Sequence, residues 1–343
     1  MAHLPLRLIL DGEALVANWR WLDRLSGNAA CGAAVKADGY GLGAKEVVRR
    51  LAEAGCRDFF VATWAEAEAL APWDETLSLS VLHGVARDDV EVPRWARPVL
   101  NSAEQVWRWR GRGPCDVMID TGINRLGLSA QDVDDGVLSG IEIRTLMSHL
   151  ACADEDVPAN ERQRAAFADV AAGVTAERRS LANSAGICLG PDYAFDLTRP
   201  GLALYGGIPR REAEGHIRPV VRIEAQIVQR RRVEAGGSVG YNACFTAEAG
   251  CELAILNIGY ADGYLRGFSN AGRARAAPGG AWLPVAGRVS MDLTAIQVDA
   301  APELKEGDWL EVDFDLPAAA SASGLSQYEL LTTLGSRFAR SWN

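Results

Sequence analysis

Lys36 follows a short apolar run and opens a glycine-rich segment that contains one tyrosine, Tyr40. In an α/β barrel, reactive side chains lie where a strand ends and the next loop begins. A lysine amine at such a position can form a Schiff base with an aldehyde cofactor such as pyridoxal phosphate. Taken alone, the segment fits a surface lysine after a buried strand better than a reactive one, so the chemical interpretation depends on further residues.

Five further segments carry motifs that resemble those of bacterial alanine racemases, in the same order along the chain. With residues 33–43 around Lys36, the resemblance extends over nearly the whole sequence. It implies a pyridoxal phosphate-dependent racemase that interconverts L-alanine and D-alanine. The segments are residues 119–127, 147–151, 182–185 with 198–206, 239–241 with 258–263, and 287–292.

Racemisation removes the α-proton from one face of the amino acid and returns a proton to the other. It therefore needs two acid–base groups on opposite sides of a stabilised carbanion. The resemblance assigns one face to Lys36 and the other to Tyr241, which reaches the site from the second subunit of a homodimer. A tyrosine ordinarily titrates near ~10, so it needs activation, and the resemblance implies that His149 joins its hydrogen-bond network.

The resemblance also implies a set of cofactor contacts. Arg199 would face the pyridine nitrogen and keep it unprotonated, because a guanidinium only donates hydrogen bonds. Loops after the last two strands of such barrels often bind phosphate through backbone N–H groups. The residues expected at the phosphate are Ser184, Gly201, Leu202 and Tyr40, with Asn183 supporting Ser184.

A third group would contact the substrate. By resemblance, Arg125 binds the substrate carboxylate and a cofactor oxygen. Tyr260, Met291 and Asp292 would line a narrow entrance that favours a small amino acid, and Tyr328 would close the pocket beside the cofactor.

Met118 departs from the family pattern. Many members carry a carbamylated lysine there, whose negative charge lies beside the arginine that matches Arg125. Methionine cannot be carbamylated, and an unpaired buried arginine would cost several kcal/mol. We hypothesise that a bound anion such as chloride, or a nearby carboxylate, orients Arg125 instead, and that Met118→Lys does not raise turnover.

The elements that must position these residues show two patterns. Short apolar runs alternate with amphipathic segments such as 44–54 and 65–71, which predicts a (β/α)8 TIM-type barrel over residues 10–215. Residues 220–228 alternate at period two and are followed by further short β-like runs. Residues 216–343 are therefore predicted to form a mostly antiparallel β domain, which the N-terminal strand in residues 1–10 could join. Residues 318–324 are expected to form a loop. The predicted barrel strands are 31–36, 58–63, 77–83, 98–101, 115–120, 145–149, 180–184 and 202–205.

Composition limits the possible partners. The 343 residues carry a formal charge of −10, which argues against nucleic acid or an acidic membrane surface as a partner. The seven cysteines show no metal-binding spacing and are expected to be reduced and mostly packed. The N-terminus lacks the apolar length of a signal peptide or membrane span, so we expect a cytoplasmic protein.

Several functions remain open at this stage. The leading one is an alanine racemase that supplies D-alanine for peptidoglycan. A racemase for serine or for several small amino acids is the nearest alternative, since a single hydroxyl changes discrimination by only about 1–3 kcal/mol. A non-catalytic pyridoxal phosphate-binding protein would lack the β domain with Tyr241. A decarboxylase with the same barrel would present a carboxylate where Arg199 is expected.

Overall fold

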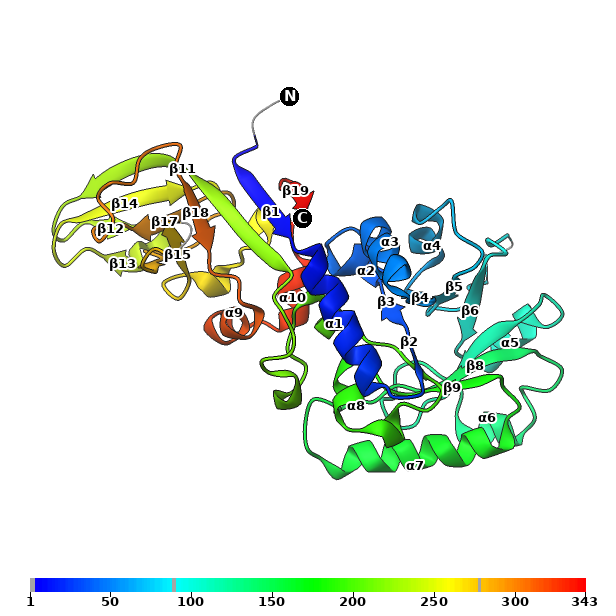
Figure 1. Ribbon diagram of the computed structural model, residues 1–343. Coiled ribbons are helices and arrows are strands. Elements are labelled where there is room, and N and C mark those ends of the chain that lie inside the picture. The colour runs from blue at the N-terminus through cyan, green and yellow to red at the C-terminus, as the bar shows by residue number, and fades with distance from the viewer. Residues whose placement is uncertain (1–3, 88–90, 277–278) are drawn as a thin grey trace. The chain divides into compact units, whose positions relative to one another are not determined.

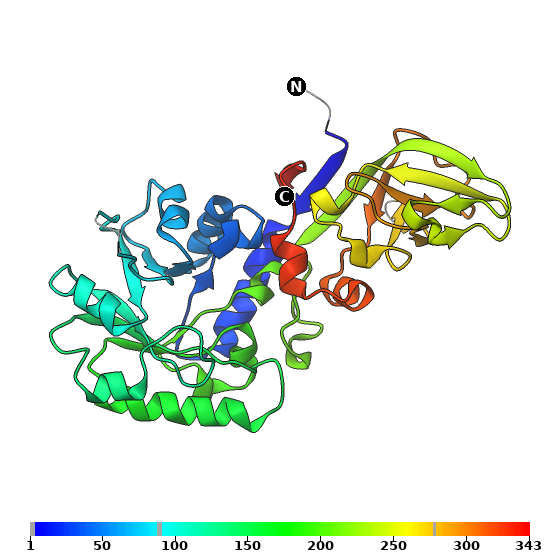
Figure 2. The same cartoon turned by 180° about the vertical axis from the view of Figure 1, so that it is seen from behind.

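The structure is a computed structural model that describes residues 4–87, 91–276 and 279–343. The chain divides into two compact units (Figures 1 and 2). One unit is Leu15–Arg218, and the other combines the N-terminal strand with Pro219–Asn343. Each is described by itself below.

The Leu15–Arg218 unit contains a curled parallel sheet whose strands follow one another in chain order. A second parallel pair joins β2 (Ala30–Cys31) to β10 (Leu197–Thr198). The strands of the larger sheet are β3 (Ala33–Ala34), β4 (Asp58–Val61), β5 (Ser78–Val81), β6 (Ala96–Leu100), β7 (Cys115–Met118), β8 (Ile143–Met147) and β9 (Arg178–Ser180).

Backbone hydrogen bonds close the sheet into a barrel. The N–H of Ala34 donates to Pro200 at 2.8 Å, and the N–H of Arg199 donates to Ala182 at 2.8 Å. Only Gly32 separates β2 from β3, and a Cβ there would lie 2.8 Å from the carbonyl oxygen of Asp58. The predicted (β/α)8 barrel class is therefore confirmed, with β2 and β3 acting as one strand.

The last predicted strand, 202–205, is wrong. Leu202–Tyr205 forms the 3-10 helix η2, and the eighth strand is β10, a few residues earlier. All four side chains of η2 are buried. A short apolar run that is buried on every side has the same pattern as a central strand, so periodicity cannot separate the two.

Helices follow most of the strands, and the predicted helix at 44–54 is confirmed as α3 (Ala44–Ala54). The segment predicted at 65–71 is the shorter α4 (Trp64–Ala69), which begins at a capping box formed by Thr63 and Glu66. The other helices of this unit are α1 (Gly12–Leu25, whose first turn falls in the other unit), α2 (Lys36–Tyr40), α5 (Ala103–Trp109), α6 (Ala130–Asp134), α7 (Pro158–Gly173), α8 (Ser184–Cys188), η1 (Pro191–Tyr193) and η3 (Arg211–Ala213).

The second unit is a mostly antiparallel sheet, as predicted, built on the long strand β11 (Val221–Val233). Strand β11 pairs with β1 (Leu6–Leu10), β14 (Cys251–Leu256) and β18 (Trp309–Val312). The remaining elements are β12 (Ser238–Val239), η4 (Tyr241–Ala243), β13 (Phe245–Thr246), η5 (Tyr260–Asp262), η6 (Arg266–Phe268), β15 (Arg273–Ala276), β16 (Leu283–Pro284), β17 (Thr294–Gln297), α9 (Leu316–Ser323), α10 (Gln327–Thr332) and β19 (Ala339–Trp342).

The loop expected at 318–324 is also wrong, because most of it lies in α9. The Asp315 carboxylate accepts the N–H of Ala318 at 3.1 Å, which caps the first turn. Alanine is the strongest helix former, and Gly324 ends the helix in the left-handed conformation. The run of small residues therefore favours a helix once it is capped at both ends.

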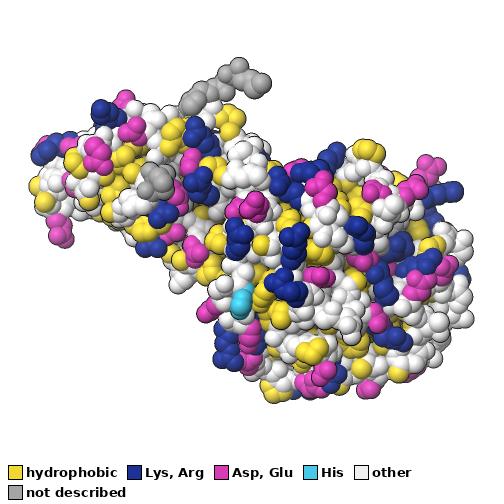
Figure 3. Space-filling view, viewed as in Figure 1, with side chains coloured by type: hydrophobic (Ala, Val, Ile, Leu, Met, Phe, Trp, Pro, Cys, Tyr) yellow, Lys and Arg dark blue, Asp and Glu magenta, His cyan; other side chains and the backbone are white. Residues whose placement is uncertain are grey.

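The surface charges, the cysteines and the apolarity of the helices can be compared with the expectations drawn from composition. On the face shown in Figure 3, basic and acidic side chains are interspersed rather than gathered by sign. All seven cysteines, which lie in the described part of the chain, are free, and four of them are buried. No helix within the described residues has the length and apolarity needed to cross a membrane.

Candidate active site

Lys36 opens a short turn with an unusual backbone. Ala37, Asp38 and Tyr40 have φ values of 52°, 51° and 55°, and Gly39 between them has 64°. With Gly41 at 84°, five consecutive residues adopt the left-handed conformation, which costs roughly 1–2 kcal/mol for each residue other than glycine. Contacts from the surrounding structure must offset this cost.

Those contacts come from both sides of the turn. The N–H of Gly39 donates to Val35 at 2.8 Å, and the N–H of Gly43 donates to the carbonyl of Asp38 at 2.8 Å. The Asp38 carboxylate accepts the N–H of Ala44 at 2.8 Å, which ties the turn to the start of α3. The result is a closed loop with Lys36 at the carboxyl end of the first barrel strand.

Tyr40, at the end of the turn, packs inside the barrel. Its ring stacks on Tyr205 with 4.6 Å between centroids, and the Tyr205 hydroxyl donates to the carbonyl of Ala34 at 2.8 Å. A Cβ at Gly201 would lie 2.2 Å from the Tyr40 hydroxyl oxygen. Glycine is thus required at position 201 for the tyrosine hydroxyl to approach the backbone so closely.

Ser184 also contacts the backbone at Gly201. Its hydroxyl oxygen accepts the N–H of Gly201 at 2.9 Å and that of Ala203 at 3.2 Å. The Asn183 side chain accepts the N–H of Gly186 at 2.8 Å and so caps α8, which begins at Ser184. The predicted phosphate residues Ser184, Gly201, Leu202 and Tyr40 are therefore brought together, and their hydroxyl and N–H donors suit a phosphate group.

Arg199 is buried at the end of β10. Its Nη1 donates to the Ser180 hydroxyl, and its Nη2 donates to the carbonyl of Ser148 at 2.5 Å. Burial lowers the pKa of Arg199 to about 10, and the negative charge of Asp116 opposes this shift. The guanidinium therefore stays protonated at neutral pH and offers only hydrogen-bond donors.

His149 follows Ser148 at the end of β8. Burial, followed by the positive charges of Arg199, Arg125 and Lys36, lowers the pKa of His149 to about 3. The imidazole is therefore neutral at neutral pH. Tyr241 belongs to the other compact unit, and the predicted link between His149 and Tyr241 stays a prediction.

The loop that carries Arg125 is organised by Asp120. One carboxylate oxygen accepts the N–H groups of Gly122 and Asn124 at 2.8 and 3.1 Å, and the other accepts that of Arg125 at 3.2 Å. A Cβ at Gly127 would lie 2.4 Å from the backbone nitrogen of Asp120, so the loop folds tightly onto the strand end. This arrangement fixes the backbone of Arg125 while its side chain stays exposed.

The charges around Lys36 favour its neutral form. Burial is the main cause that lowers the pKa of Lys36, and the positive charge of Arg125 lowers it further. The negative charge of Glu66 acts in the opposite direction. A neutral amine is the form that attacks a carbonyl or accepts a proton.

Met118 lies in an apolar layer of the barrel interior, 7% exposed. It packs with Phe60, Val99, Met147 and Leu197. The concern that Arg125 becomes a buried unpaired charge is not supported, because this side chain is exposed in the chain. Within the described residues, no carboxylate forms an ion pair with Arg125, so the nearby carboxylate of our hypothesis is not observed.

In the C-terminal unit, two loops hold Tyr260, Met291 and Asp292 together. The N–H of Tyr260 donates to Ser290 at 3.0 Å, and that of Ala261 donates to Met291 at 3.0 Å. Arg337 binds both carboxylate oxygens of buried Asp262 at 2.6 and 2.7 Å, and reaches Asp292 at 2.6 Å. The side chains of Tyr241, Met291 and Tyr328 are exposed within the chain at 64%, 52% and 48%.

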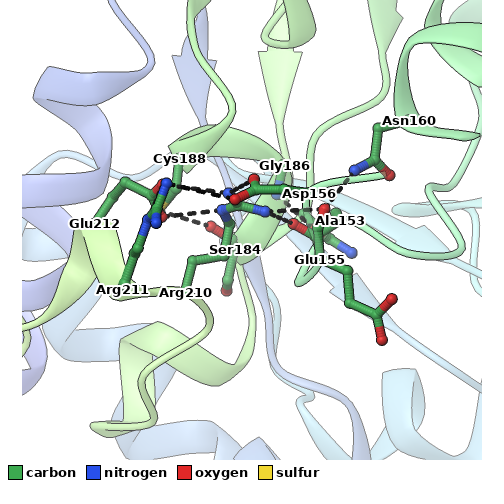
Figure 4. Close-up of polar contacts among 11 residues, drawn as sticks. Ala153, Glu155, Asp156, Asn160, Ser184, Gly186, Cys188, Arg210, Arg211 and Glu212 are labelled. Atoms are coloured by element: carbon green, nitrogen blue, oxygen red, sulfur yellow. Dashed lines mark hydrogen bonds and ion pairs between the residues drawn. The ribbon is translucent and has the colours of Figure 1, made fainter. Parts of the chain in front are cut away.

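Arg210 holds the loop that follows His149. Its buried guanidinium donates to the carbonyls of Ala153 and Glu155 at 2.9 and 3.1 Å, and it also pairs with Asp156 and Glu212 (Figure 4). Figure 4 places these contacts beside Ser184, Gly186 and Cys188 of α8. The loop between β8 and α7 is thus tied to the segment that follows the predicted phosphate site.

Several of these supporting residues were not singled out from the sequence. They are Glu66, Asp120, Ser148, Ser180, Arg210 and Arg337. One of them had a readable signal, because Thr63-x-x-Glu66 before an apolar run is the pattern of a capping box. The others contact backbone groups, as Asp120 and Arg210 do, or side chains distant in the sequence, as Ser180 and Arg337 do, and these contacts form only when the chain folds.

Comparison with known proteins agrees with this geometry. Residues 10–209 match the alanine racemase N-terminal domain family, and residues 220–342 match the alanine racemase C-terminal domain family. A biosynthetic alanine racemase from Agrobacterium fabrum is 41% identical over 98% of this chain and 94% of its own length. A catabolic alanine racemase from the same organism is also 41% identical, over 98% of this chain and 91% of its own.

A solved structure has the same fold. The crystal structure of alanine racemase from Bartonella henselae with covalently bound pyridoxal phosphate matches with a TM-score of 0.92 and 35% identity, over 99% of both chains. Both domain families match in order and together cover nearly all of the sequence. The chain therefore belongs to the alanine racemase family.

Proposed function

We propose that this protein is an alanine racemase that interconverts L-alanine and D-alanine with pyridoxal phosphate bound at Lys36. The observation that carries the proposal is the arrangement in the barrel unit. A lysine on a left-handed turn, with its pKa lowered by burial, shares one strand-end face with Arg199 and with the hydroxyl and N–H donors around Ser184. Membership of the family supports the same reaction.

The residues present fit the cofactor. Ser184, Tyr40 and the backbone N–H groups at Gly201 and Leu202 would hold its phosphate, and Lys36 would hold its aldehyde carbon. Arg199 would donate to the ring nitrogen and leave it unprotonated, since a guanidinium accepts no hydrogen bond. When bound, pyridoxal phosphate stabilises the negative charge that develops at the substrate α-carbon.

The chain's own groups would move the protons. The Lys36 amine accepts or returns the α-proton on one face, and the Tyr241 hydroxyl does so on the other. Arg125 binds the substrate carboxylate, while Tyr260, Met291, Asp292 and Tyr328 limit the size of the substrate. Two acid–base groups on opposite faces explain inversion, because a single group would return the proton to the side from which it came.

Three further parts of the proposal concern context. We infer a homodimer in which Tyr241 serves the partner's site, and we expect the enzyme to act in the cytoplasm. We also propose that its D-alanine enters peptidoglycan. The two Agrobacterium fabrum relatives, one biosynthetic and one catabolic, are equally similar to this chain, so the metabolic role has to be established by deletion and D-alanine rescue.

The test is exchange of the α-proton in D2O with added pyridoxal phosphate. The wild type should exchange and invert both enantiomers of alanine, while Tyr241→Phe should lose inversion but still exchange one enantiomer through Lys36. Tyr193→Phe, which removes a hydroxyl from the surface turn η1, is the matched control and should behave as wild type. Exchange of neither enantiomer by the wild type would refute the proposal, and kcat/KM for serine measured alongside would define substrate breadth.

A further inference from the structure

The Glu66 carboxylate connects the start of α4 to the lysine turn. One oxygen accepts the N–H of Ala62 at 2.6 Å and that of Thr63 at 3.4 Å, as part of the α4 capping box. The other oxygen accepts the N–H of Ala37 at 2.9 Å. Ala37 is the residue directly after Lys36, so one half-buried carboxylate binds both segments.

This contact acts at the first left-handed residue of the turn. Ala37 has φ 52° and ψ 48°, a conformation that alanine avoids without support. Asp38 secures the far end of the turn through Ala44, and Gly39 and Gly43 bond within it. Among the described residues, Glu66 supplies the side-chain hydrogen bond at the near end of the turn, where Lys36 leaves the strand.

We propose that Glu66 is a positioning residue for Lys36. It holds the Ala37 amide so that the left-handed turn presents the Lys36 amine toward the site, and its negative charge opposes the effect of the positive charge of Arg125 on this amine. The effect on turnover rests on the role of Lys36 proposed above, whereas the effect on the turn itself does not.

The electrostatic surroundings of Lys36 give this role a measurable consequence. The charged and titratable groups coupled to it are Arg125, from the loop after β7, His149, from the end of β8, and Glu66, from α4. Arg125 favours loss of the lysine proton, and Glu66 opposes it. Removing the Glu66 charge should therefore lower the Lys36 pKa further.

The competing interpretation is that Glu66 only caps α4. A change at Thr63 distinguishes the two interpretations. The Thr63 hydroxyl accepts the N–H of Glu66 at 3.2 Å within the same capping box, whereas the Ala37 amide donates to Glu66. Thr63→Ala weakens the cap and leaves the carboxylate on the Ala37 amide. Glu66→Gln removes the charge, and its amide offers only one acceptor oxygen for the N–H groups of Ala37, Ala62 and Thr63.

The first experiment uses the cofactor-free full-length protein. The chain contains three lysines, Lys36, Lys45 and Lys305, so competitive acetylation across pH, followed by mass spectrometry, reports each amine separately. In Glu66→Gln the labelling midpoint of Lys36 should move to lower pH, while Lys45 and Lys305 keep theirs. In Thr63→Ala all three midpoints should stay as in wild type.

The second experiment measures kcat and KM for alanine in the cofactor-loaded enzyme. Glu66→Gln should lower kcat at least tenfold with KM changed less than threefold, and Thr63→Ala should change kcat less than twofold. Adding Ala37→Gly to Glu66→Gln should recover part of kcat, because glycine adopts positive φ without steric cost. Equal effects of Glu66→Gln and Thr63→Ala on kcat and on the Lys36 midpoint would overturn the proposal.

Two controls keep the result interpretable. If circular dichroism shows that Glu66→Gln does not fold, the shorter Glu66→Asp keeps the charge but cannot span both contacts, and an unchanged kcat in that variant would also overturn the proposal. Acetylation requires neither cofactor nor substrate. A shifted Lys36 midpoint in a protein that racemises nothing would therefore uphold the placement of Glu66 while refuting the proposed function.

Discussion

The guanidinium of Arg199 donates a hydrogen bond to the backbone carbonyl of Ser148, the residue directly before His149. Its other terminal nitrogen donates to the hydroxyl of Ser180 on β9. One buried side chain therefore ties together the ends of two neighbouring strands and sets the position of the histidine between them. The proposed contact of Arg199 with the cofactor depends on this bracing.

Arg199→Lys should retain the charge but lose the bracing. An ammonium on a flexible stem cannot reproduce the planar fork that reaches Ser148 and Ser180 together. We expect kcat/KM for alanine to fall by about 10²-fold, the loss that a displacement of about 1 Å in an active site can cause. Arg179→Lys, on the neighbouring strand, is the control for loss of an arginine. A fall of less than threefold in Arg199→Lys would contradict this account.

His149 should make the free energy of unfolding depend on pH. Its pKa in the folded chain is about 3, against an ordinary value of 6.5. As pH falls below 6.5, the histidine binds a proton in the unfolded chain but not in the folded chain. The contribution of neutral His149 to the free energy of unfolding is therefore fully present above pH 6.5 and is lost progressively toward pH 3. The loss is at most about 1.4 kcal/mol per pH unit.

The measurement is urea unfolding at pH 7, 5.5 and 4.5. The free energy of unfolding of His149→Gln should fall less steeply than that of wild type over this range, because glutamine binds no proton. His216→Gln, which removes an exposed histidine stacked on Trp21, controls for loss of an imidazole ring. Parallel slopes for wild type and His149→Gln would show that the histidine is not held neutral.

Much of this arrangement could be read from the sequence, and the failures have physical causes. The lysine turn, Arg199 and the residues predicted to hold a phosphate could be singled out because their motifs are local and keep their order. Residues 202–205 and 318–324 were misassigned because a buried turn resembles a strand and a run of alanines resembles a loop until its caps are seen. Asp120 and Arg210 act on backbone N–H and carbonyl groups, which leave no pattern in side-chain type. The Thr63-x-x-Glu66 spacing indicates the cap of α4 but not the contact of Glu66 with the Ala37 amide.

Met118→Lys should not create a more active enzyme. The position lies in an apolar layer with Phe60 and Met147, and an unmodified ammonium there costs several kcal/mol. We expect a lower free energy of unfolding and no gain in kcat/KM, whereas Met118→Leu, which keeps the volume and apolarity, should change stability by less than about 1.5 kcal/mol. A several-fold gain in kcat/KM for Met118→Lys in bicarbonate buffer would show that the layer can accept a carbamylated lysine.

Subunit mixing should restore activity if Tyr241 serves the partner's site. Lys36→Ala and Tyr241→Phe should each be nearly inactive, but a hybrid dimer combines one intact Lys36 with one intact Tyr241 in the same site. Equal mixing should place hybrids at about half of all dimers, each with one working site. Mixing Lys36→Ala with the double variant Lys36→Ala/Tyr241→Phe is the control and should stay inactive. No recovery after native mass spectrometry confirms subunit exchange would refute the shared site.

Arg210 should be the main support of the loop after His149. Its side chain is 5% exposed and donates to the buried carbonyl of Ala153 and to the carbonyl of Glu155. Arg210→Met leaves the Ala153 carbonyl without this donor, at about 1–3 kcal/mol, whereas the Glu155 carbonyl keeps the side-chain amide of Asn160 at 2.8 Å. We therefore expect a loss of about 1–3 kcal/mol in the free energy of unfolding. Proteolysis should then cut first within residues 150–157.

Arg211 provides the matched comparison, because it pairs with the same Asp156 and Glu212 but is 76% exposed. Surface pairs of this kind contribute at most about 1 kcal/mol, so Arg211→Met should leave both the unfolding curve and the proteolytic pattern close to wild type. If the two variants lost equal stability, the ion pairs would be the main contribution, and the carbonyl contacts of Arg210 would not explain how the loop is held.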